Sequence, residues 1–202
     1  LQVYNEQQKL AEWAEKVKSD LLTLLSELKD KENWTYKAIY KVVEAHSEGD
    51  NIILANNKCE CCHGKILPLK RESEKSACLS DFVSPDKDYV GVFATSVNVE
   101  NILTTLREQG REYDAMLLQL FADRLAEALS VWQYEKVKQQ WGVENMIRPA
   151  VGYSCLPNHS LKQDLLEILE NKIDITLTET GAMMPVSSVC GLYISNSKAK
   201  YF

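Results

Sequence analysis

The sequence predicts an α+β fold, and three observations support that prediction. Amphipathic helical segments and short β-rich segments both occur along the 202 residues. The two kinds of segment do not alternate regularly, which argues against a doubly wound parallel sheet. Glycine and aspartate separate two neighbouring β-rich segments, which is typical of an antiparallel hairpin.

The composition is ordinary for a soluble globular protein and argues against two classes of partner. Hydrophobic residues make up 45% of the chain and charged residues 26%. The net charge of −6 provides no basic surface for nucleic acid. No stretch approaches the roughly 18 consecutive apolar residues of a membrane span. The chain begins without a recognisable export signal, and its six cysteines then favour a reducing compartment, so we expect a cytoplasmic protein.

Residues 4–30 predict an amphipathic helix. The charged run at 29–32 follows the helical pattern and ends it. We therefore divide the chain into an N-terminal helix packed on the domain, residues 1–35, and the domain itself, residues 36–202. The apolar residues recur at three- and four-residue steps and form one stripe: Leu10, Trp13, Ala14, Val17, Leu21, Leu24, Leu25 and Leu28.

The residue pattern changes at Tyr36 from helical periodicity to a series of short β-rich segments. The turn at 47–50 predicts a hairpin between the first two segments, and a second turn near 56–64 leads to the third. The fourth segment, DYVGVFATSV, is the strongest predicted strand of the chain. The four segments are residues 38–45, 51–55, 65–71 and 88–97.

The second half of the chain combines helices and strands. Asn98 is placed to cap a helix that ends near Gly110, and a longer helix spans about 111–140. Ser160 and Gln163 predict a capping box that opens a further helix. Two strands close the chain, and they are expected at residues 173–180 and 187–195.

The segment 147–156, IRPAVGYSCL, is typical of a fixed cation next to main chain that small residues leave accessible to a ligand. Pro149 fixes its own φ and biases Arg148 toward an extended conformation. Gly152 permits dihedral angles, or a close ligand approach, that a β-carbon forbids. The planar fork of Arg148 accepts two parallel bonds from a carboxylate or a phosphate. An ordinary loop with a surface arginine remains the alternative.

The segment 147–156 suits a small zwitterionic ligand, which also needs an acid for its positive charge. Two carboxylates are candidates. Asp81 lies among apolar neighbours, where it is either a ligand group or a turn residue before Pro85. Glu127 lies on the apolar side of the long helix, either paired with a helix neighbour such as Arg124 or turned toward a site. Tyr153 and Tyr201 either stack on an aromatic ring or face a sulfonium cation, or they are half-buried sheet residues.

The cysteine-rich run Cys59–His63 raises the question of a metal site. Three thiolates and one imidazole form a legitimate zinc ligand set. All four lie within five residues, however, whereas structural zinc sites draw their ligands from two separated pairs. We therefore predict no native metal here, and a metal- or redox-responsive protein remains an alternative. Cys78, Cys155 and Cys190 are expected to be core or near-site residues.

Four motifs occur in order: CLSDFVSP…DYVGVFATS, then YDAMLLQLFADRLAEAL, then IRPAVGYSCLPNHSLK, then LTETGAMMPVSSVCGLYIS…KYF. Together they resemble the activation (reactivation) domain of cobalamin-dependent methionine synthase. The resemblance covers about residues 36–202 and is strong from Ala77 onward. It implies an α+β domain with a bent, mainly antiparallel sheet flanked by helices, which binds S-adenosylmethionine in a shallow groove.

The resemblance also implies roles for particular residues. Arg148 corresponds to the arginine that holds the methionine carboxylate, and Asp81 to the aspartate that holds the methionine ammonium. The backbone at Ala150 and Gly152 is expected to contact the ligand. The remaining residues expected at the groove are Glu127, Tyr153, Tyr201 and Phe202.

The implied function is to support reductive methylation of inactive cob(II)alamin to methylcobalamin within methionine synthase, a methyltransferase. S-adenosylmethionine supplies the methyl group, and flavodoxin or a similar donor supplies the electron. Cobalamin is carried by a separate cobalamin-binding module, so the chain is not expected to be active alone. A regulatory S-adenosylmethionine-binding protein without a methyl-transfer role is the second alternative.

Overall fold

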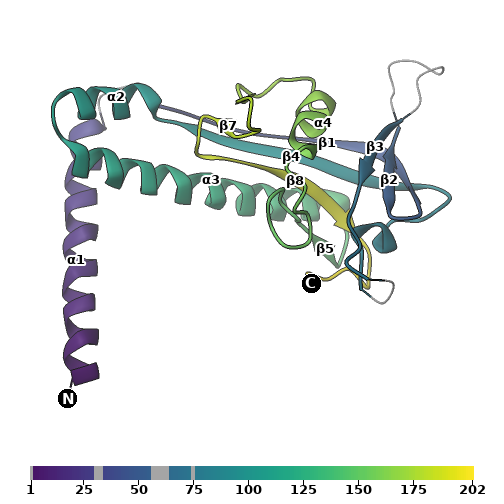
Figure 1. Ribbon diagram of the computed structural model, residues 1–202, viewed down its shortest axis with the longest axis horizontal. Helices are drawn as coiled ribbons and strands as arrows, with labels where there is room; N and C mark the ends of the chain where they lie inside the picture. Colours follow the sequence, from purple (N-terminus) through teal and green to yellow (C-terminus); the bar gives the residue numbers. More distant parts are fainter. Residues whose placement is uncertain (1, 30–33, 56–63, 74–75) are drawn as a thin grey trace.

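The computed structural model describes residues 2–29, 34–55, 64–73 and 76–202 (Figure 1). The helical elements are α1 (Gln2–Leu28), the short 3₁₀ turn η1 (Leu79–Phe82), α2 (Glu100–Glu108), α3 (Glu112–Trp141) and α4 (Leu161–Ile168). The strands are β1 (Thr35–Glu48), β2 (Asn51–Leu54), β3 (Lys65–Pro68), β4 (Asp88–Asn98), β5 (Met146–Ile147), β6 (Thr176–Leu177), β7 (Met183–Met184) and β8 (Ser188–Ser195).

Six of these strands form one antiparallel sheet in the order β3-β2-β1-β4-β8-β5. Strands β1, β4 and β8 are long and form its centre, and β6 and β7 pair separately. The predicted α+β class with a mainly antiparallel sheet flanked by helices is confirmed. The hairpin predicted at 47–50 is the turn between β1 and β2, which pair from Glu48↔Asn51 to Ala45↔Leu54.

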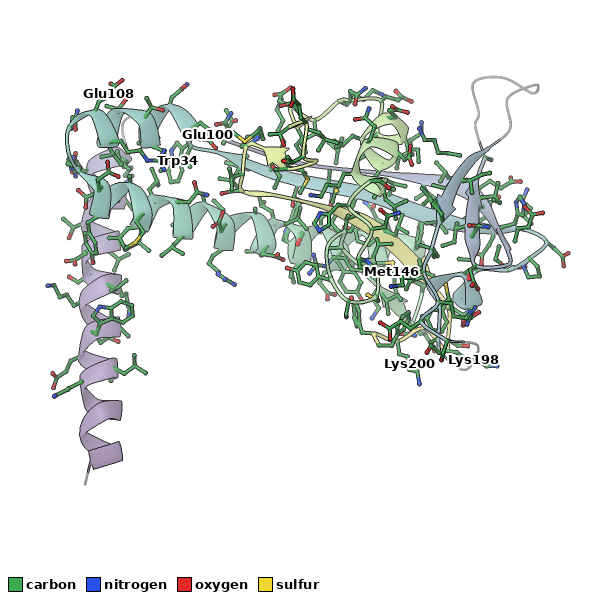
Figure 2. The ribbon with its side chains drawn as sticks, in the orientation of Figure 1. Trp34, Glu100, Glu108, Met146, Lys198 and Lys200 are labelled. Atoms are coloured by element: carbon green, nitrogen blue, oxygen red, sulfur yellow. The ribbon has the colours of Figure 1, made fainter. Side chains whose placement is uncertain are left out.

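The two faces of the sheet are covered by different helices. Side chains alternate along a strand, so neighbours in β4 enter opposite halves of the core. Phe93 and Val97 pack in the cluster that contains the buried residues of α3, whereas Val92 and Ala94 pack with those of α4. Figure 1 shows α3 running along one side of the sheet and α4 on the other. Trp34 lies toward the α2 end of the molecule and Met146 toward the other end of α3 (Figure 2).

Helix α1 extends away from the sheet at one end of α3 (Figure 1). Its C-terminal part packs on the domain through the buried Leu24 and Leu28. Further along the predicted apolar stripe, Leu10 and Trp13 are exposed. Arg111 joins the two helices, because its guanidinium donates two hydrogen bonds of 2.8 Å to Glu27. The division of the chain at residue 35 remains a prediction.

Three local predictions were wrong. The predicted strand at 173–180 pairs only at β6, and β5 and β7 were not anticipated. Ser160 has helical dihedral angles, and its hydroxyl bonds to Asn158 rather than capping α4. Val99, not Asn98, occupies the N-cap position of α2, although Asn98 accepts a hydrogen bond of 3.1 Å from the Glu100 N–H.

Among the residues that the structure describes, no helix has the length and apolar character needed to cross a membrane. The cysteine-rich run Cys59–His63 lies outside these residues, so the structure does not bear on its predicted role.

Two glycines make room for aromatic rings on the α3 side of the sheet. Gly91 of β4 pairs with Tyr193 of β8, and Phe93 pairs with Gly191. The rings of Phe93 and Tyr193 stack with centroids 4.6 Å apart and planes at 15°. A β-carbon on Gly191 would lie 2.2 Å from the Pro149 carbonyl oxygen and 2.9 Å from Phe93 Cε1. Close packing here therefore requires glycine at position 191.

We predict that Gly191→Ala lowers the free energy of unfolding by about 3 kcal/mol, the upper end of the usual cost of overpacking. The added methyl group meets backbone that cannot move without breaking the pairing of Pro149 with β8. Urea unfolding measures the change. Gly110→Ala is the control, since a β-carbon there meets nothing within 4 Å and costs only the left-handed φ of 71°, about 1 kcal/mol. Equal losses in the two variants would contradict the predicted close contact.

Candidate functional site

The residues that follow β5 continue its pairing with β8 in the same register. Met146 pairs with Ser195 and Ile147 with Ile194, and an isolated bridge then joins Ala150 to Gly191. On either side of the bridge, the Leu192 N–H donates to the Pro149 carbonyl and the Val151 N–H to the Cys190 carbonyl, both at 2.9 Å. Pro149 lacks an N–H group, and this edge of the sheet is where a strand tolerates proline. Residues 146–151 therefore act as an interrupted edge strand.

This pairing directs Arg148 toward α3. Ile147 and Val151 are buried on the α4 side of the sheet, whereas Met146 and Ala150 are buried on the α3 side. Because side chains alternate along an extended chain, Arg148 projects to the same side as Met146 and Ala150. The sequence predicted an extended Arg148 before Pro149, and the structure adds the face on which its side chain lies.

The guanidinium of Arg148 lies against one face of α3. Its Nη1 donates a hydrogen bond to Ser130 Oγ, and its Nη2 lies 4.0 Å from Glu127 Oε2. The guanidinium carbon is 5.8 Å from the centre of the Phe93 ring, a cation–π distance. The side chain is only 19% exposed. The backbone N–H of the same residue donates to Tyr201 Oη at 2.8 Å.

A cavity of about 290 Å³ opens beside this arginine. Its size lies at the lower end of the range for small-molecule sites, about 300–1,000 Å³. Five of the eight sequence-predicted site residues line it, from three separate parts of the chain. The lining consists of Glu127, Arg148, Pro149, Ala150, Tyr153, Ser154, Cys155 and Tyr201.

Glu127 and Tyr153 are joined across the cavity. The Tyr153 hydroxyl donates a hydrogen bond of 2.9 Å to Glu127 Oε1. This bond raises the pKa of Tyr153, and partial burial raises it further. Of the two placements considered for Glu127, the structure shows the one that faces Tyr153 and Arg148. Burial also raises the pKa of the half-buried Cys155 thiol, which keeps that group protonated at neutral pH.

Gly152 and Phe202 flank the cavity without lining it. Gly152 has a φ of +98°, and its N–H closes a turn onto the Leu156 carbonyl. A β-carbon there would also lie 3.0 Å from His159 Cε1, so the turn needs glycine. The Phe202 carbonyl accepts a hydrogen bond of 3.1 Å from Ser154 Oγ, which holds the segment after β8 against the cavity loop.

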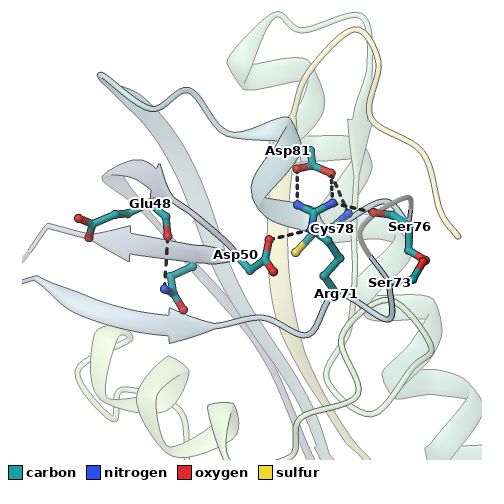
Figure 3. A network of polar contacts seen from close by, with 8 residues as sticks. Glu48, Asp50, Arg71, Ser73, Ser76, Cys78 and Asp81 are labelled. Atoms are coloured by element: carbon teal, nitrogen blue, oxygen red, sulfur yellow. Dashed lines mark hydrogen bonds and ion pairs between the residues drawn. The ribbon is translucent and has the colours of Figure 1, made fainter.

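Asp81 does not line the cavity, and its carboxylate is paired with Arg71. The two guanidinium nitrogens of Arg71 lie 2.9 and 2.6 Å from the carboxylate oxygens, in the two-pronged arrangement of Figure 3. Arg71 lowers the pKa of Asp81, and a hydrogen bond from the Cys78 N–H lowers it further. The ring of the adjacent Phe82 lies 6.5 Å from that of Phe202. No pattern in the sequence predicts this ion pair.

Sequence reasoning also missed Ser130, Pro149 and Ser154 as residues of the site. Ser130 lies one helical turn after Glu127, and that spacing is the signal that places it on the same face of α3. Cys155 was expected to be in the core or near the site, and it lines the cavity.

The cavity combines groups suited to a small ligand with both charges. Arg148 provides a fixed cation for a carboxylate. Glu127 and the faces of Tyr153 and Tyr201 provide partners for a cation. Within the described ranges, no cluster of three or more His, Cys, Asp or Glu residues is placed to hold a metal ion. The residues present therefore suit an organic ligand held by charge and aromatic contact.

Comparisons with known proteins show the family to which the chain belongs. A family model described as "Vitamin B12 dependent methionine synthase, activation domain" matches residues 2–202. Among solved structures, the chain is similar to one described as "Crystal Structure of the MetH Reactivation Domain bound to AdoHcy", with a TM-score of 0.82 and 28% sequence identity. That alignment covers 94% of this chain and 67% of the other. The resemblance seen in the four motifs is thus confirmed, and the family match also includes α1. The chain belongs to the family of activation domains of vitamin B12-dependent methionine synthase.

Proposed function

We propose that the cavity binds S-adenosylmethionine and that Arg148 holds the methionine carboxylate. The observation that carries this proposal is the guanidinium of Arg148, which is hydrogen-bonded to Ser130 of α3 and lines a cavity of small-molecule size. The related reactivation domain is described as bound to AdoHcy, which is S-adenosylmethionine without its transferable methyl group. The planar guanidinium of an arginine is a strong and directional carboxylate partner.

Asp81 is proposed to hold the methionine ammonium, as the family resemblance implies. Its pairing with Arg71 means that the ligand has to share this carboxylate. Glu127 is the other acid near the ligand and lines the cavity directly. The backbone at Ala150 and Gly152 and the rings of Tyr153, Tyr201 and Phe202 complete the proposed contacts.

In this proposal the chain orients a methyl donor and does no acid–base chemistry of its own. Reductive methylation joins cob(II)alamin, one electron and the methyl group of S-adenosylmethionine into methylcobalamin, and releases S-adenosylhomocysteine. Cobalamin is carried by the cobalamin-binding module of methionine synthase, and flavodoxin or a similar protein donates the electron. Arg148 and Asp81 hold the amino-acid end of the donor, which leaves its sulfonium free to face the docked module.

The chain is proposed to work as a domain or subunit of this methyltransferase in the cytoplasm. Among the described residues, Cys78, Cys155 and Cys190 are free thiols, as is usual in a reducing compartment.

Arg148→Ala is predicted to weaken S-adenosylmethionine binding by on the order of 2–3 kcal/mol, roughly 30- to 150-fold. The loss arises because the ligand carboxylate keeps its desolvation cost without its partner. Calorimetry measures it. Arg107→Ala is the control, since Arg107 lies in the last turn of α2 and does not line the cavity. Equal binding by Arg148→Ala and the unchanged protein would contradict the proposed carboxylate site.

The two acids are separated by a second pair of variants. We expect Asp81→Asn to weaken binding about tenfold, the scale of one charge-assisted hydrogen bond, and Glu127→Gln to have a smaller effect. Asp50→Asn is a matched control, because Asp50 is the other carboxylate partner of Arg71, with a Nε–Oδ1 distance of 2.8 Å. If Asp81→Asn behaves like Asp50→Asn while Glu127→Gln loses affinity, the ammonium is held by Glu127 instead.

The full function is tested by reactivation of a cobalamin-binding module in the cob(II)alamin state. The mixture contains this chain, a flavodoxin-type reductant and S-adenosylmethionine labelled in the methyl group. We expect label on cobalamin only when the chain is present, and much less label with Arg148→Ala. Binding of the ligand without any transfer of label would support the regulatory alternative and contradict the methylation role.

A further inference from the structure

We infer that Ser130 is a positioning residue that fixes the orientation of Arg148 before any ligand arrives, an inference that rests on the proposed function. Ser130 lies on α3, three residues after Glu127, and is fully buried. Its hydroxyl lies between a backbone carbonyl of its own helix and the guanidinium of Arg148.

The direction of each hydrogen bond follows from the groups involved. A serine hydroxyl has one hydrogen to donate and two lone pairs to accept with. Ser130 Oγ donates its hydrogen to the Glu127 carbonyl at 2.8 Å, which fixes the hydroxyl orientation on the helix. A lone pair is then left for Nη1 of Arg148, which can only donate. The hydroxyl thus transmits the geometry of the α3 backbone to the guanidinium.

The other contacts of the guanidinium are less directional. Glu127 Oε2 lies 4.0 Å from Nη2, beyond hydrogen-bond distance, and the Phe93 ring is 5.8 Å away. In the part of the chain that the structure describes, Ser130 is the one side chain within hydrogen-bond distance of this guanidinium. The Tyr201 contact is made by the Arg148 backbone N–H and does not orient the fork.

A fixed guanidinium orientation matters for affinity, because arginine is a long side chain with much rotamer freedom. If that freedom is lost only when the ligand binds, affinity falls by the ordering cost. Removal of the Ser130 hydroxyl should therefore lower the affinity for ligands that carry a carboxylate and leave the affinity for ligands without one unchanged. A serine that merely stabilised α3 would affect both ligands alike.

The experiment compares Ser130→Ala and Ser130→Thr with two ligands, S-adenosylmethionine and its decarboxylated form. We expect Ser130→Ala to weaken the binding of S-adenosylmethionine about fivefold, which is less than the loss of a full charge-assisted hydrogen bond. The affinity for the decarboxylated ligand should stay unchanged. Ser130→Thr keeps a hydroxyl that can bond the same helix carbonyl, so it should retain most of the affinity. Equal weakening of both ligands, or none of either, would overturn the inference.

Thr95→Val is a matched control for the loss of a buried hydroxyl. Thr95 is fully buried, and its Oγ1 donates to the Ala126 carbonyl of α3 at 3.2 Å. Among the residues that the structure describes, this carbonyl is the one hydrogen-bond partner of Thr95 Oγ1. The variant therefore removes a hydroxyl that supports the same helix and leaves the Arg148 contact in place. We expect Thr95→Val to lower the free energy of unfolding without changing the preference for the carboxylated ligand. A changed preference in this control would overturn the inference.

A second readout needs no ligand. In ¹⁵N NMR spectra of the free protein, a held guanidinium rotates slowly about its Nε–Cζ bond, and Arg148→Lys assigns the signal. We expect slow rotation in the unchanged protein and in Ser130→Thr, and fast rotation in Ser130→Ala. Unchanged rotation in Ser130→Ala would overturn the inference. If the unchanged protein does not bind S-adenosylmethionine but its rotation responds as expected, the proposed function fails and the positioning role holds.

Discussion

The pairing of residues 146–151 with β8 is the constraint on which the site depends. It tolerates one missing donor at Pro149 and resumes at Ala150, because Gly191 lets the two backbones approach closely. The alternation of an extended chain then places Arg148 on the α3 side of the sheet. Without that register, the arginine would face the α4 side, where Ile147 and Val151 lie in an apolar core.

Helix α3 contributes one residue that lines the cavity and two residues that hold the neighbouring side chains in place. Glu127 lines the cavity, Ser130 contacts the arginine, and Gln133 accepts a hydrogen bond of 3.1 Å from the Tyr193 hydroxyl. Tyr193 in turn stacks on Phe93, over which the guanidinium of Arg148 lies. Glu127, Ser130 and Gln133 follow one another at intervals of three residues, so they lie on one face of α3. That face therefore positions both the aromatic rings of the sheet and the proposed carboxylate site.

The sequence alone was sufficient for the long elements and for several of the residues that line the cavity. Helical periodicity located α1 and α3, the β-rich run DYVGVFATSV located β4, and glycine at the first hairpin located its turn, because these signals are local. The motifs located Arg148, Ala150, Tyr153 and Tyr201, which line one cavity. Short elements such as β5 escaped, because two residues carry no periodicity and form a strand only through β8.

The side-chain partners of Asp81 and Arg148 could not be predicted for a similar reason. Arg71 and Asp81 are ten residues apart in the sequence, and no spacing rule for helices or strands predicts a contact between them. Ser130 is separated from Arg148 by a helix end and a turn, so only the tertiary fold brings the hydroxyl to the guanidinium. The helical step between Glu127 and Ser130 was readable, but it had no meaning until Arg148 was known to face α3.

A crystal structure of this protein with S-adenosylhomocysteine tests the central claim most directly. We predict that the ligand lies in the cavity beside Tyr153 and Tyr201, with its carboxylate on the two-pronged face of Arg148 and with Ser130 still bonded to that guanidinium. A ligand bound elsewhere, or one in this cavity whose carboxylate makes no contact with Arg148, would contradict the account.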